Sequence, residues 1–177
     1  EGRESLVPPV QEVMKDEIAR LSERYGAPFR VAESLPCGDF SPIASPRSGE
    51  VAMVVRRKNG KILLNTKDFY PEGAYRIPTG GIKAGESVES ALLREVAEET
   101  NLRVEVERFL SLITYQAPER EGPFTPYAFL LREISGDLKV NDPAERISGW
   151  REVSVGELKG VAERLVFQRV RRRLGGR

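Results

Sequence analysis

The residues best suited to chemistry are three acidic side chains close together in the chain, Glu95, Glu98 and Glu99. In a helix, Glu95 and Glu99 lie on one face, with Glu98 beside them. Carboxylates near the end of a helix, where negative charge is least favourable, need a compensating cation. Arg94 supplies one, four residues before Glu98, but a single guanidinium does not neutralise three carboxylates. We therefore infer a bound hard metal ion, Mg²⁺ with Mn²⁺ as the alternative.

The element that must position these acids is a helix that begins near Ser87, because glycines precede this point and apolar residues then recur at helical spacing. The positions i, i+3, i+4 and i+7 of one face are Val88, Ala91, Leu92 and Glu95. This face is apolar at its start and acidic at its end, so its acids are predicted to point toward the core. The alternative is a solvated acidic helix face.

Residues 80–102, GGIKAGESVESALLREVAEETNL, resemble the Nudix box, the signature of the Nudix hydrolases. The matching positions, with their spacing, are Gly80-x5-Glu86-x7-Arg94-Glu95-Val96-x-Glu98-Glu99-x-Asn101-Leu102. The one departure is Asn101, where the family usually has glycine. That position ends the helix in a left-handed backbone conformation, for which asparagine is the next most favourable residue.

The resemblance implies an α/β fold, a Nudix-type α/β/α sandwich with a mixed β-sheet, and Mg²⁺-dependent hydrolysis of a nucleoside diphosphate linked to another group. The metal ligands that it implies are Glu95, Glu98, Glu99 and the Gly80 carbonyl. Glu86 would support the site, linked to the metal through water. Arg94 would orient Glu98 rather than touch the substrate.

The resemblance leaves two alternatives for the general base, because the family uses either a box glutamate or a glutamate on a later loop. Glu145, in the segment NDPAER before Trp150, lies where such a loop acid is expected. The alternative is an exposed loop glutamate. Glu119 and Glu121 are weaker candidates for the same role.

Length and composition limit the remaining possibilities. The chain has 177 residues, with 28 basic and 27 acidic side chains and a net charge of +1, which gives no support for a nucleic-acid or membrane partner. It has no histidine, so any acid–base chemistry falls to carboxylates. Cys37 is alone, no apolar run is long enough to span a bilayer and no signal-peptide pattern opens the sequence. A cytoplasmic protein is therefore expected.

Residues 1–49 are predicted to form an N-terminal extension, ahead of a Nudix domain over residues 50–177. A helical pattern after Pro8 and Pro9 ends at Gly26, a short strand is expected over Phe29–Ala32, and a loop is expected over Leu35–Ser48. The apolar face of the helix packs either on the main domain or on a partner subunit, and a homodimer is possible by analogy with Nudix subfamilies.

The domain itself is predicted to contain strands on both sides of the box helix. The expected strands are Val51–Arg57, Lys61–Leu64, Tyr75–Ile77, Arg103–Ile113, Phe124–Leu131 and Leu138–Val140. Asn59-Gly60 predicts a hairpin with a type I′ turn, which needs positive φ at both residues. Ser154 and Glu157 predict a capping box for a C-terminal helix.

Only weaker sequence features indicate the substrate. Pro118 lies sixteen residues after Leu102, a spacing similar to that of the ADP-ribose pyrophosphatase subgroup. We therefore expect a small nucleotide substrate, ADP-ribose or a nucleoside diphosphate sugar. The alternative substrates are nucleoside triphosphates and dinucleoside polyphosphates. A non-catalytic nucleotide-binding module is the alternative to an enzyme. RNA-end processing is a further alternative function, because the chain has a basic cluster at Arg169, Arg171, Arg172 and Arg173.

Overall fold

A computed structural model describes residues 10–35, 47, 49–118 and 121–161. Its centre is one mixed sheet of seven strands, in the order β1-β5-β6-β2-β3-β7, with β4 paired to β2. The strands are β1 Phe29–Ser34, β2 Gly49–Arg56, β3 Ile62–Lys67, β4 Thr79–Gly81, β5 Arg103–Gln116, β6 Thr125–Ser135 and β7 Ile147–Val153. Both parallel and antiparallel pairs occur, which confirms the predicted mixed sheet.

The box helix is α2, Val88–Thr100. Ser87 caps its N-terminus by accepting a hydrogen bond from the Ser90 amide, which confirms the predicted start. The residues that it buries are Val88, Ala91, Leu92, Glu95, Val96, Glu99 and Thr100. The predicted stripe, apolar at its start and acidic at its end, therefore does face the interior.

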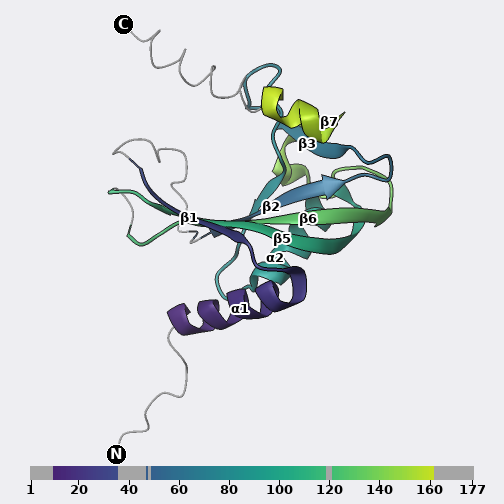
Figure 1. Cartoon of the computed structure of the whole chain (residues 1–177). Helices are drawn as coiled ribbons and strands as arrows, with labels where there is room; N and C mark the ends of the chain where they lie inside the picture. Colours follow the sequence, from purple (N-terminus) through teal and green to yellow (C-terminus); the bar gives the residue numbers. More distant parts are fainter. Residues whose placement is uncertain (1–9, 36–46, 48, 119–120, 162–177) are drawn as a thin grey trace, which may run out of the picture.

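Helices cover both faces of the sheet (Figure 1), as the α/β/α prediction requires. On one face, α2 packs over the side chains of Val51, Met53 and Val55 of β2. On the other face, Leu158 from the helical residues 155–161 packs near Ile62 and Leu64 of β3. Successive strand residues point to opposite faces, so one strand serves both cores.

The N-terminal helix α1, Val10–Tyr25, packs on the same face as α2, and Leu21 is 4% exposed in the shared core. The Val88 amide donates to the Glu17 carboxylate at 2.6 Å, and Tyr25 donates to Glu89 on α2. The sequence left open what α1 packs against. In the structure it contacts the domain that carries the box, and β1 pairs in parallel with β5.

Three local predictions are wrong. The hairpin between β2 and β3 exists, but its turn is not type I′, because Gly60 has a φ of 80° while Asn59 is not among the residues with positive φ. The Asn59 side chain accepts from the Lys61 amide and donates to Glu152, which holds it in another conformation. Tyr75–Ile77 is not a strand: only Arg76 forms an isolated bridge.

Leu138–Val140 is not a strand either, and its backbone contacts explain why. The Lys139 amide donates to the Thr100 carbonyl, and the Asn141 amide donates to the Glu98 carbonyl. These donors satisfy carbonyls at the end of α2, which would otherwise lack partners. The predicted strands also do not include β7, Ile147–Val153, which pairs with β3.

Several predictions fall outside the described residues, namely those on Glu119, on the loop between 36 and 46 and on the basic cluster from Arg169 to Arg173. Within the described part of the chain, no helix is both long and apolar enough to cross a membrane.

Candidate functional site

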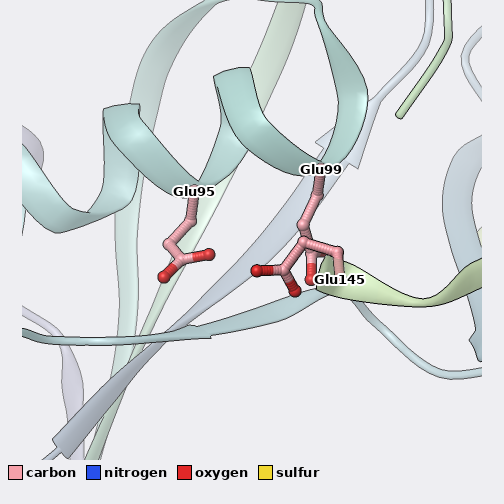
Figure 2. A group of neighbouring side chains, drawn as sticks. All are labelled: Glu95, Glu99 and Glu145. Carbon is pink, nitrogen blue, oxygen red and sulfur yellow. The ribbon is translucent and has the colours of Figure 1, made fainter. Parts of the chain in front are cut away.

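Three carboxylates come together at one end of α2. Glu95 and Glu99 lie one turn apart on the helix, and Glu145 reaches them from the short 3₁₀ helix η1, Pro143–Glu145. One oxygen from each lies within 4.8 Å of the others. Figure 2 shows the Glu95 and Glu99 side chains leaving the helix on the same side, with Glu145 arriving from the separate segment.

Burial sets the electrostatics of this group. Glu99 is 0% exposed and Glu95 is 5% exposed. Burial disfavours the charged form, so the pKa of Glu95 is raised and the pKa of Glu99 is raised to about 8. The Glu95 Oε2 atom is buried and has no hydrogen-bond partner among the described residues. A buried carboxylate oxygen without a donor is the feature that a cation would satisfy.

Gly80 makes room for Glu95. A β-carbon built on Gly80 would lie 1.9 Å from Cδ and 2.2 Å from Oε2 of Glu95, so any side chain at this position would occupy the place of the carboxylate. This close packing explains the glycine at the start of the box by space rather than by backbone conformation.

Two residues of β3 contact Glu99, and sequence reasoning missed both. The Lys67 ammonium donates to Glu99 at 3.1 Å and to Glu145 at 2.9 Å, and Asn65 Nδ2 donates to Glu99 at 3.3 Å. Burial opposes the charged ammonium, but the two carboxylates raise the pKa of Lys67 above its ordinary value. Lys67 therefore places a positive charge between Glu99 and Glu145.

Arg94 forms five hydrogen bonds and organises the acids on the other side of the site. It binds Glu86 with two bonds of 2.7 and 2.8 Å, Glu95 at 2.7 Å, Glu98 at 2.8 Å and the Gly81 carbonyl at 2.8 Å. These bonds use every N–H that a guanidinium offers. The bond to Glu98 agrees with the predicted orienting role, and Arg94 also orients Glu95, a ligand candidate.

The loop that carries Glu145 is docked onto the end of α2. The Asn141 and Asp142 amides donate to the Glu98 carbonyl, and Asn141 Nδ2 donates to the Ala97 carbonyl. Asp142 caps η1 by accepting from the Ala144 amide. Glu145 is thus held in place by backbone contacts with the helix that carries the other two acids.

Asn101, the departure from the box, has a left-handed backbone with φ of 57°, as the sequence predicts. Its side chain does more than glycine could do. Asn101 Nδ2 donates to the Asp137 carbonyl, and its Oδ1 accepts from Asn141. The substitution therefore ties the helix end to the loop of Glu145.

The site fits a hard divalent cation. Its donors are carboxylate oxygens, the ligands that Mg²⁺ prefers. One of them, Glu95 Oε2, lacks a hydrogen-bond partner within the part of the chain that the structure describes, and Gly80 leaves the space in which the Glu95 carboxylate sits. The donor set and its packing therefore agree with a metal centre.

The structure separates the predicted site residues into two groups. Glu95, Glu99 and Glu145 form the cluster. Glu98 and Glu86 lie on Arg94 instead and are not in that cluster. Glu121 is exposed. The sequence signal that could have indicated Lys67 is its position soon after a buried strand, but such positions are common.

Comparison with known proteins agrees with this geometry. The chain matches the NUDIX domain family over residues 46–171. It is 33% identical over 94 residues to the ADP-ribose pyrophosphatase of Methanocaldococcus jannaschii, which covers 52% of this chain and 54% of that protein. It is 29% identical over 137 residues to the NAD-capped RNA hydrolase NudC of Photobacterium profundum, which covers 77% of this chain and 49% of that one. The chain thus spans about half the length of these curated relatives.

Solved structures agree on the fold. A NUDIX hydrolase from Nitrosomonas europaea superposes with a TM-score of 0.52 at 22% identity, covering 67% of this chain and 79% of that one. An Ap4A hydrolase from C. elegans superposes with a TM-score of 0.50 at 20% identity, covering 66% and 86%. With the family match over most of its length and the box residues in the arrangement described above, the chain belongs to the Nudix hydrolase family.

Proposed function

We propose that the protein hydrolyses a phosphoanhydride bond in a nucleoside diphosphate linked to a second group, with Mg²⁺ or Mn²⁺ as the cofactor. The observation that carries the reaction class is the cluster of Glu95, Glu99 and Glu145, in which Oε2 of Glu95 is buried and has no hydrogen-bond partner among the described residues. ADP-ribose is the leading substrate. It is supported by the relative named ADP-ribose pyrophosphatase and by the spacing of Pro118.

Glu95, Glu99 and Glu145 are the residues that would hold the ion. Bound there, the ion would neutralise charge on the pyrophosphate oxygens and lower the pKa of a water molecule. Arg94 holds the Glu95 carboxylate through its 2.7 Å hydrogen bond, which leaves Oε2 free to bind the cation. Asn65 supports Glu99 in the same way.

We assign Glu145 as the proton acceptor for the attacking water, through the carboxylate oxygen that would not hold the ion. Its side chain is 22% exposed, so it contacts solvent, whereas the Glu99 side chain is 0% exposed. A base on a docked loop would also be held at a fixed distance from the reacting bond. The box glutamate Glu98, whose side chain is 30% exposed, is the alternative base.

The remaining predicted ligands have outer roles in this proposal. Glu98 lies beside the cluster and can add a carboxylate when substrate is bound. Glu86 acts through Arg94, to which it is bonded by both oxygens. The Gly80 carbonyl is kept as a candidate ligand, because the glycine lies against Glu95.

A second candidate substrate is NAD-capped RNA. It is supported by the relative named NAD-capped RNA hydrolase NudC, whose match covers 77% of this chain. The reaction class would be the same, because the bond cleaved is again a phosphoanhydride. The two candidates differ in what lies beyond the pyrophosphate.

The test is a hydrolysis panel at fixed Mg²⁺ with product analysis. The panel compares kcat/KM for ADP-ribose, nucleotide sugars, dinucleoside polyphosphates, nucleoside triphosphates and NAD-capped RNA. ADP-ribose should give AMP and ribose 5-phosphate with the highest kcat/KM. A preference for triphosphates, with release of pyrophosphate, would overturn the substrate proposal, and the absence of hydrolysis across the panel would overturn the reaction class.

A further inference from the structure

We propose that Lys67 is an internal counter-cation that competes with the divalent metal ion for Glu99 and Glu145. When the ion binds, the Lys67 ammonium leaves these carboxylates and becomes available to the anionic pyrophosphate of the substrate. Metal and substrate binding would then be coupled through one side chain. This inference rests on the proposed function for the identity of the substrate, but its metal-binding half can be tested without catalysis.

The first support is that Lys67 occupies oxygens of the metal cluster itself. Its ammonium lies 3.1 Å from Glu99 Oε1 and 2.9 Å from Glu145 Oε2. The other Glu99 oxygen, Oε2, accepts from Asn65. Both oxygens of Glu99 therefore already have protein donors, and a cation that binds Glu99 must replace or weaken one of these bonds.

The second support is charge. An ammonium and a divalent cation bound to the same two carboxylates would lie only a few ångströms apart, where their repulsion is strong in a buried site. The Lys67 side chain is 13% exposed, so water does little to screen it. Of the two cations, the lysine is the mobile one, because its ammonium is carried on a flexible four-carbon chain.

The third support is the fate of the displaced ammonium. Among the described residues, the acidic side chains that form ion pairs with Lys67 are Glu99 and Glu145. All five hydrogen bonds of Arg94, by contrast, go to residues other than Glu99 and Glu145, so Arg94 need not move. A displaced, desolvated ammonium needs a new anion, and the pyrophosphate of a substrate at this site supplies one. The metal ion thereby prepares the site for the substrate.

The experiment measures metal binding without substrate. Lys67→Met removes the charge and keeps the length of the side chain, and Lys61→Met is the matched control at an exposed position before the same strand. Mn²⁺ and Mg²⁺ affinities are measured by calorimetry. We expect Lys67→Met to bind either ion about tenfold more tightly than the wild type, within the usual range of coupling between sites, and Lys61→Met to be unchanged. Weaker or unchanged binding in Lys67→Met would overturn the competition.

A second measurement tests whether Lys67 couples metal binding to substrate binding. A non-hydrolysable ADP-ribose analogue with a methylene bridge between the phosphorus atoms is titrated with and without Mg²⁺. In the wild type, Mg²⁺ should strengthen binding of the analogue; in Lys67→Met this strengthening should fall about tenfold. An equal effect of Mg²⁺ in both proteins would overturn the coupling.

A further variant and a measurement of thermal stability serve as controls for effects on folding. Without metal, Lys67→Met leaves two carboxylates, Glu99 and Glu145, without their ammonium, so the melting temperature in a chelator should fall and the rise on adding Mg²⁺ should exceed that of the wild type. Lys67→Gln should behave in the same way. A smaller rise with Mg²⁺ in both variants would contradict the inference. Because none of these readouts needs turnover, the hydrolysis panel can fail while the competition is still observed, and the reverse.

Discussion

The carboxylate of Glu95 fills the space in which a side chain on Gly80 would begin, with Cδ of Glu95 only 1.9 Å from the position of a β-carbon. Gly80→Ala must therefore displace Glu95 and its contact with Arg94. We expect a loss of stability of about 1–3 kcal/mol from overpacking and a larger loss of Mg²⁺ affinity, measured by denaturation and calorimetry. Gly81→Ala is the control, because the atoms nearest the new β-carbon there belong to the side chain of Arg47, an exposed residue, and not to Glu95. Equal effects of the two variants would contradict this explanation.

Asn101 allows a prediction that separates backbone conformation from side-chain contacts. Asn101→Ala must hold a left-handed backbone at a cost of about 1–2 kcal/mol and loses the contacts with Asp137 and Asn141. Asn101→Gly loses the contacts alone and should cost less than the alanine variant. Urea denaturation of both variants measures the difference. A glycine variant less stable than the alanine variant would show that the φ of 57° is not the dominant factor.

Glu17 connects the N-terminal helix to the start of the box helix. The Val88 amide donates to Glu17 at 2.6 Å, and Glu17→Ala would leave this helix donor without its acceptor. The expected loss is about 1–2 kcal/mol in the free energy of unfolding. Arg24→Ala, which removes a salt bridge whose arginine side chain is 66% exposed, should have little effect. An unchanged free energy of unfolding in Glu17→Ala would show that α1 does not stabilise α2 through this hydrogen bond.

The lowered pKa of Glu86 predicts how stability changes with pH. Its hydrogen bonds with Arg94 lower the pKa of Glu86 from 4.5 to about 2. The ionised carboxylate therefore stabilises the fold above its ordinary pKa, and this contribution is lost as the pH falls toward about 2. Glu86→Gln should be less stable than the wild type by about 2 kcal/mol near neutral pH, and the difference should shrink in acid. Denaturation over a pH series measures it, and a difference independent of pH would contradict the assignment.

The box helix was predictable because its signals are local. The helix start at Ser87, the buried stripe through Glu95 and Glu99, and the left-handed Asn101 all follow from neighbouring residues, and the structure confirms them. Glu145 was placed near the box by the resemblance to the family, and the structure brings it to the cluster, although its role as a base stays a prediction.

The residues that the sequence missed are brought to the site by tertiary structure. Lys67 and Asn65 belong to β3, which was predicted to end at Leu64 but continues to Lys67. Only the packing of the sheet against α2 shows that these residues meet Glu99. Likewise, Leu138–Val140 has the composition of a strand, but the carbonyls at the end of α2 provide better hydrogen-bond partners for it.

In the proposed function, the buried carboxylate of Glu99 holds the metal ion on which phosphoanhydride hydrolysis depends. The most direct test is kcat/KM for ADP-ribose at saturating Mg²⁺ in Glu99→Gln, with products identified as AMP and ribose 5-phosphate. Glu89→Gln is the control, because Glu89 lies on the same helix but contacts Arg24 and Tyr25 instead of the site. We predict a loss on the order of 100-fold or more in Glu99→Gln and near-wild-type activity in Glu89→Gln. A wild-type rate in Glu99→Gln would contradict the claim.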